Sequence, residues 1–183
     1  MRVFVLFLII LIDAVLQGTL LQGIGILGIV PNISIALVAT YALLRDDVEG
    51  AIFGLCLGFV KDVLHSDILG YYSLMFLVAG YLCGKSRRSF YRENYISALA
   101  IIALTAFLYE TAFYITGFLL RGNALFLHYL THIILPTVLY TTLVSVIIYF
   151  LMCRINNLLE GRLRHRKIRR SPTFHKKQAF YKK

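Results

Sequence analysis

The chain is a succession of apolar segments joined by short polar connections, and this pattern leaves few folds open to it. The segments cover residues 3–21, 24–44, 50–64, 68–84, 96–120 and 133–153. A helix of roughly 20 apolar residues crosses the ~30 Å hydrocarbon core of a bilayer. Of 183 residues, 59% are hydrophobic and only 15% are charged, which excludes an ordinary water-soluble enzyme. We therefore predict an all-α integral membrane protein, a six-transmembrane-helix bundle over residues 1–153.

The third segment, residues 50–64, leaves two topologies open. Its 15 residues would cover about 22 Å as a helix, less than the hydrocarbon core. Lys61 and Asp62 also lie near its end. Six complete spans, or four spans and a re-entrant hairpin over residues 50–84, place every other segment on the same side. The charge distribution therefore does not separate the two.

The basic residues are concentrated on one predicted side of the membrane. Residues 154–183 hold 11 of the 19 Lys and Arg residues, and Glu160 is their only acidic residue. With the N-terminus inside, 17 of the 19 basic residues face the cytoplasm, as the positive-inside rule requires. We therefore expect a multi-pass membrane protein with both termini in the cytoplasm.

Residues 154–183 are predicted to form a basic cytoplasmic tail, which begins as a continuation of the last helix and then becomes disordered. Beside so hydrophobic a body, basic side chains favour anionic lipid headgroups as their partner, rather than nucleic acid. The residues expected to contact headgroups are Arg87, Arg88, Arg92, Arg162, Arg164 and Arg166.

Glycines recur along one predicted helix face. Gly50, Gly54, Gly58 and Asp62 follow one another at four-residue spacing, so they share a stripe of the helix surface. Such glycines allow a second helix to approach closely. Gly80 and Gly84 form a shorter pair of the same kind. The stripe is interpreted as internal packing within the bundle or, alternatively, as a docking face for another subunit.

Four polar residues fall inside the predicted spans. They are Asp13, Gln17, Lys61 and Glu110. Counted from the inner helix ends, Asp13 lies about 15 Å deep, Lys61 about 17 Å and Glu110 about 21 Å. Ionisable groups at this depth should face the interior and be paired, which favours a structural Lys61–Glu110 or Lys61–Asp13 ion pair over a proton or ion path. Asp13 and Gln17 share a helix face and are expected to hydrogen-bond across helices.

The sequence lacks the motifs of common catalytic sites. It contains no G-x-x-x-x-G-K-[ST], no H-E-x-x-H and no G-x-S-x-G. No metal-ligand spacing connects its histidines and cysteines. We therefore expect a protein that is not an enzyme and that has no metal and no cofactor.

The segment 31–84 resembles the MreD family of bacterial rod shape-determining membrane proteins. The similarity rests on Pro31-Asn32, Leu43-Leu44-Arg45, Glu49-Gly50-Ala51-x-x-Gly54-x-x-x-Gly58-x-x-x-Asp62, Leu69-Gly70 and Gly80-Tyr81-x-x-Gly84. Three positions depart from the family pattern: Asn32 stands where the family has Asp, Asp46 where it has Gly, and Lys61 interrupts an apolar run.

The resemblance implies a six-span, non-enzymatic component of the cell-elongation machinery, which directs peptidoglycan synthesis. Such proteins bind MreC-like single-span proteins and act with MreB-like filaments, RodA-type synthases and penicillin-binding synthases. The family also resembles, in fold, the substrate-binding subunits of energy-coupling-factor transporters. A substrate-binding membrane subunit of a vitamin-type transporter is therefore the alternative function.

Overall fold

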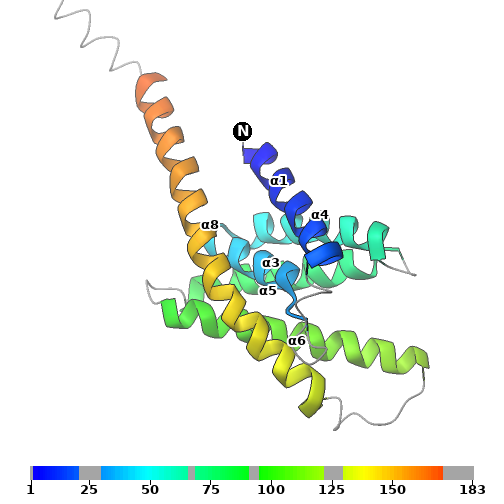
Figure 1. Cartoon of the computed structure of the whole chain (residues 1–183). Coiled ribbons are helices and arrows are strands. Elements are labelled where there is room, and N and C mark those ends of the chain that lie inside the picture. The colour runs from blue at the N-terminus through cyan, green and yellow to red at the C-terminus, as the bar shows by residue number, and fades with distance from the viewer. Residues whose placement is uncertain (1, 21–29, 66–68, 91–94, 122–129, 171–183) are drawn as a thin grey trace, which may run out of the picture.

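The described part of the chain is all-helical. The structure, a computed structural model, describes residues 2–20, 30–65, 69–90, 95–121 and 130–170. These ranges contain six α-helices and two five-residue π-helical segments, and no strand (Figure 1). The elements are α1 (Arg2–Val15), η1 (Leu16–Leu20), α3 (Ile33–Leu44), α4 (Asp47–His65), α5 (Tyr71–Phe90), α6 (Tyr95–Arg121), η2 (Leu130–Ile134) and α8 (Leu135–Arg170). The predicted all-α class is confirmed.

Two helical segments of the described chain are long and apolar enough to cross a membrane. They are Ile96–Thr116, with a mean hydropathy of 1.8, and Leu130–Asn156, with a mean hydropathy of 2.1. Phe4–Gly18 and α3 are apolar but shorter. α4 and α5 have the length of a span, with 19 and 20 residues. Both carry several charged residues, which lower their hydropathy.

The helix bounds differ from the predicted spans in several places, and α5 for example runs to Phe90, six residues past the predicted end at 84. The span predicted over residues 24–44 is helical only from Ile33 among its described residues. Pro31 lacks an N–H and disfavours helical geometry in the residue before it. The Asn32 side chain then caps α3 by accepting a hydrogen bond from the Ile35 N–H. α4 begins earlier than the predicted segment 50–64. Its first turn starts at Asp47 and is polar, so a search for apolar residues did not include it.

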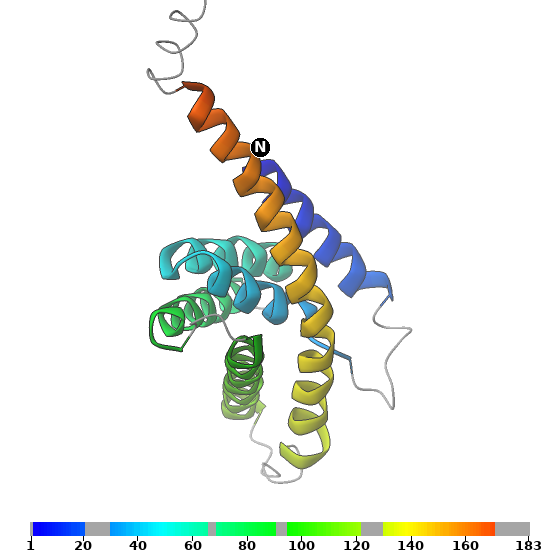
Figure 2. The ribbon, with the colours of Figure 1, turned by 90° about the vertical axis from the view of Figure 1, so that its left-hand side faces the viewer.

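α4 and α5 form a tight antiparallel hairpin, and α3 packs against both (Figures 1 and 2). Gly70 just precedes α5 with a φ of 96°, a conformation that side-chain-bearing residues rarely adopt. α3 is apolar around its whole circumference, which is typical of a helix enclosed by others. Its residues Ile35, Val38, Ala39, Ala42 and Leu43 are at most 1% exposed. α3 therefore forms the centre of the core.

α8 is a continuous helix of 36 residues that extends well beyond the other helices (Figure 2). Its buried face carries the small polar residues Thr137, Thr141 and Ser145 at four-residue spacing. Small residues of this kind allow close packing between membrane helices, and here α8 packs against α3 and α6. The helix continues past Cys153 as expected and reaches Arg170. The predicted disorder falls on residues 171–183, which lie outside the described part of the chain.

Candidate functional site

The glycines of α4 contact α5 of the same chain. A Cβ atom added at Gly54 would collide with the backbone carbonyl of Phe76. One added at Gly58 would lie 2.6 Å from the Cα of Ser73. Real Cβ atoms essentially never come within 3.0 Å of a neighbouring heavy atom. At these positions the two backbones are therefore in direct contact, with no room for any side chain.

The remaining glycines of the pattern complete the same contact. Gly50 and Gly80 face each other, and a Cβ on Gly80 would collide with the Gly50 carbonyl. A Cβ on Gly50 would collide with Ala42 of α3 and would lie 3.1 Å from the Gly80 carbonyl oxygen. At the far end, a Cβ on Gly84 would lie 2.5 Å from the Cα of Asp47. The whole glycine face is thus covered by helices of its own chain, by α5 along its length and by α3 at Gly50. This arrangement corresponds to the internal-packing interpretation and leaves no free surface there for a second protein.

Asp62 caps the N-terminus of α5. Its carboxylate accepts hydrogen bonds from the backbone N–H groups of Tyr72 and Ser73, both at 2.9 Å, and from the Ser73 hydroxyl. The first N–H groups of a helix have no intrahelical partner and favour a negative charge. Asp62 is only 1% exposed. It therefore finds its hydrogen-bond donors within the chain rather than on a partner.

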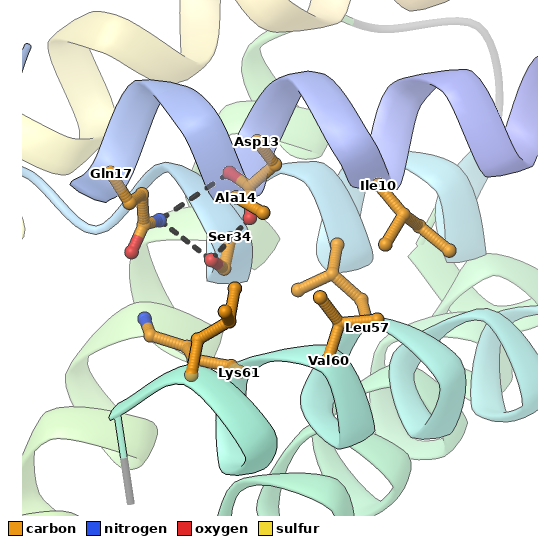
Figure 3. Close-up of a pocket in the computed structure, with 9 residues that line it drawn as sticks. Ile10, Asp13, Ala14, Gln17, Ser34, Leu57, Val60 and Lys61 are labelled. Atoms are coloured by element: carbon orange, nitrogen blue, oxygen red, sulfur yellow. Dashed lines mark hydrogen bonds between the residues drawn. The ribbon is translucent and has the colours of Figure 1, made fainter. Parts of the chain in front are cut away.

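A polar cluster connects α1 to α3. The Ser34 hydroxyl donates to Asp13 Oδ2 at 2.7 Å and accepts from Gln17 Nε2 at 2.6 Å, and Gln17 Nε2 also lies 3.4 Å from Asp13 Oδ1 (Figure 3). Asp13 is 4% exposed. The cross-helix hydrogen bonds expected of Asp13 and Gln17 are present. They attach α1 to the centre of the core through polar groups.

Lys61 reaches towards this cluster from α4 (Figure 3). Its ammonium lies over the rings of Tyr72 and Phe76, 5.4 and 5.5 Å from their centroids. It interacts electrostatically with both Asp13 and Glu110. It forms no direct ion pair with a described residue, which differs from the expected pairing. Instead of an adjacent carboxylate, the ammonium has two aromatic faces beside it, and such faces attract a cation.

Lys61 and the α1 cluster line a small cavity of about 10 Å³. Asp13, Gln17 and Ser34 supply its polar wall. Its apolar wall consists of Ile10, Ala14, Leu57, Val60 and Leu64. A cavity of this size and polarity holds about one water molecule.

Glu110 belongs to a second part of the same polar region. Its Oε1 accepts a hydrogen bond from Asn32 Nδ2 at 3.1 Å. The backbone N–H of Asn32 donates to Thr141 Oγ1 at 3.0 Å. Asn32 thus connects α6, α3 and α8 at the start of α3. The Pro31-Asn32 pair before an apolar run is a helix-start signal, but no pattern in the sequence indicates the roles of Ser34 or Thr141.

The predicted headgroup-binding residues are described only in part. Arg87 lies near the end of α5 and is partly exposed. Arg92 and the side chains of Arg88, Arg162, Arg164 and Arg166 fall outside the described part of the structure.

A family model described as rod shape-determining protein MreD matches residues 1–158. The chain belongs to the MreD family. The match includes all of the α4–α5 glycine contact and the whole polar cluster around Lys61. It ends within α8, so most of the basic tail lies beyond it. No curated protein and no solved structure matches the chain. MreD proteins are membrane components that determine rod shape, and the helical apolar segments fit this family.

Proposed function

We propose that this MreD-family protein is a non-enzymatic, multi-pass component of the cytoplasmic membrane that binds and positions an MreC-like single-span protein. Through that partner it would act with MreB-like filaments, RodA-type synthases and penicillin-binding synthases in cell elongation. The family match over residues 1–158 is the observation that carries this proposal. The all-helical core, held together by buried glycines and polar contacts, suits a component whose task is assembly.

The proposed topology has six spans within residues 1–153 and a basic tail over residues 154–183. The 19 residues of α4 and the 20 of α5 would extend about 28 and 30 Å, close to the ~30 Å of the hydrocarbon core. Asp62, which lowers the hydropathy of α4, is buried and fully hydrogen-bonded within the chain. These lengths favour complete spans over a re-entrant hairpin.

The proposed orientation, with both termini in the cytoplasm, is supported by the positions of basic residues. Lys85 follows Gly84, which contacts Asp47 at the start of α4, so Arg45 and Lys85 lie at the same end of the hairpin. Tyr149 packs in the same hydrophobic cluster as Leu43 and Cys83, so Arg154 lies near that end too. Clustering of Lys and Arg at one end is the pattern of a cytoplasmic face.

A cysteine placed at Ser66, between α4 and α5, tests this topology. Cys56, Cys83 and Cys153 are first replaced to give a cysteine-free background. We expect a membrane-impermeant thiol reagent to label the new cysteine in intact spheroplasts, because a full α4 span places residue 66 outside. Labelling only after permeabilisation would establish a re-entrant hairpin instead.

The alternative function, a substrate-binding transporter subunit, requires a ligand pocket. Small-molecule sites typically measure roughly 300–1,000 Å³. The cavity beside Lys61 has only about 10 Å³, so it does not favour this alternative.

Co-purification tests the assembly role. We expect an MreC-like protein from the same cell to remain bound when the tagged full chain is extracted in mild detergent. An unrelated single-span protein with the same tag serves as the control. If the chain instead retains a transporter ATPase and its coupling subunit, the transporter function replaces the proposal. Because α5 covers the glycine face, the partner is expected on an outer face of the bundle.

A further inference from the structure

The ammonium of Lys61 has no hydrogen-bond acceptor among the residues that the structure describes. No carboxylate oxygen of these residues lies within 4.0 Å of it, and no described side chain or carbonyl accepts a hydrogen bond from it. The rings of Tyr72 and Phe76 attract its charge. An ammonium also has three N–H donors, however, and donors removed from water are costly when they stay unpaired. Lys61 therefore requires an acceptor that these side chains do not supply.

A complementary acceptor lies on Gln17. Its amide nitrogen donates to Ser34 Oγ at 2.6 Å and lies 3.4 Å from Asp13 Oδ1. Its amide oxygen, Oε1, accepts no hydrogen bond from a residue of the described ranges. In Figure 3 this oxygen points away from Asp13 and towards the end of the Lys61 side chain. Lys61 and Gln17 thus present a donor and an acceptor without a partner in the described chain.

Both groups line a cavity that has the size of one water molecule. Its volume is about 10 Å³, and Asp13, Gln17, Ser34 and Lys61 all line it. A cavity of about 10–15 Å³ is the smallest that holds a water, and a buried water typically forms about three hydrogen bonds. A metal cation needs more oxygen ligands and would be repelled by the ammonium. Water, which both donates and accepts, matches the groups on this wall.

We propose that this cavity binds one water molecule, which joins α4 to the N-terminal helical segment. The water accepts a hydrogen bond from Lys61 Nζ and donates its two hydrogens to Gln17 Oε1 and to a carboxylate oxygen of Asp13. Lys61 thereby gains its acceptor and Gln17 its donor. The charges of Lys61 and Asp13 are joined through the water instead of by direct contact, and such a bridge is enthalpically nearly as favourable as a direct hydrogen bond.

The bridge would help to attach α1, which presents a large part of its surface away from the bundle. Phe4, Phe7 and Leu11 are each more than half exposed. The hydrogen bonds of the polar cluster connect this segment to α3. The proposed water adds a second polar connection, to α4, at the same level of the helix. Loss of the water should therefore lower the stability of the fold.

A cavity-filling substitution tests the proposal. Ala14 also lines the cavity, so Ala14→Val would displace the water and leave the Lys61 ammonium unpaired. We expect the thermal unfolding midpoint of the full chain in detergent to fall by about 2–4 °C, the shift that corresponds to about one hydrogen bond in a protein of this size. In a Lys61→Met background, which has no ammonium to satisfy, the same substitution should lower the midpoint by clearly less. Comparison of the two backgrounds removes the cost that valine has in any helix.

Ala100→Val, on the exposed face of α6, is the matched control and should shift the midpoint equally in both backgrounds. A midpoint that rises with Ala14→Val would show a dry cavity. An equal fall in both backgrounds would show that the cavity does not serve Lys61. Either result would overturn the proposal.

A density map of the wild-type chain in lipid nanodiscs, at a resolution that shows ordered water, tests the site directly. We expect a water peak within about 3.2 Å of both Lys61 Nζ and Gln17 Oε1. This measurement stands even if Ala14→Val does not accumulate. A map in which the ammonium contacts Asp13 or Gln17 with no such peak would overturn the proposal.

Discussion

Replacing Gly54 with alanine is expected to prevent the protein from accumulating in the membrane. The new methyl group would collide with the Phe76 carbonyl, which belongs to a rigid helix backbone and not to a movable side chain. α4 and α5 would have to separate along their whole contact. Overpacking commonly costs about 1–3 kcal/mol, and this estimate is a minimum where a backbone must shift. Alanine favours a helix over glycine by about 1 kcal/mol. A loss of stability in this variant would therefore come from the collision and not from helix propensity.

Gly18→Ala is the control for this substitution, because a Cβ at Gly18 meets no atom within 4 Å. The protein level in membranes and the thermal unfolding midpoint in detergent are the measurements. We expect Gly18→Ala to resemble the wild type and Gly54→Ala to be strongly reduced in both. If Gly54→Ala accumulated normally and lost only its partner, the glycine face would be a docking surface and the α4–α5 contact would be incorrect.

Replacing Asp62 with alanine is expected to have a comparable effect on stability. The substitution leaves the backbone N–H groups of Tyr72 and Ser73 buried without an acceptor. Each unsatisfied buried group costs about 1–3 kcal/mol, so the expected loss for the two groups is about 2–6 kcal/mol. Asp62→Asn keeps one acceptor oxygen and should show an intermediate loss.

Thermal unfolding in detergent measures this loss, and Glu49→Ala is its control. The exposed Glu49 carboxylate near Arg45 should contribute at most about 1 kcal/mol. If Asp62→Asn unfolded like the wild type but no longer bound an MreC-like protein, the carboxylate would serve a partner rather than the start of α5.

The sequence predicted close packing of α4 but not the helix that packs there. Glycine spacing describes one face of one helix, and it carries no information on what lies opposite. The contacts Gly50–Gly80 and Gly54–Phe76 maintain one antiparallel register, which depends on the turn between the helices. The Leu69-Gly70 pair in the sequence marks that turn, and Gly70 has the positive φ that the turn requires.

For the charged groups, too, the sequence predicted the approximate position but not the contacts. Depth counting placed Asp13, Lys61 and Glu110 at similar levels, and the three do interact. Within the described residues no carboxylate oxygen lies within 4.0 Å of the Lys61 ammonium, which lies over the rings of Tyr72 and Phe76 on another helix. No one-dimensional pattern reports such a contact. Hydropathy likewise placed the start of the second span at Ile24, whereas α3 begins at Ile33, directly after Pro31 and its N-cap Asn32.

The uninterrupted length of α8 has a mechanical consequence. Its membrane-capable part ends at Asn156, and the helix continues for 14 residues to Arg170. At 1.5 Å per residue, this extension is a rod of about 21 Å. A flexible tether would let a bound cytoplasmic protein approach the bilayer freely, whereas a helical rod acts as a spacer. A cytoplasmic protein bound at Arg170 would therefore be separated from the last membrane-capable residue by the length of this rod.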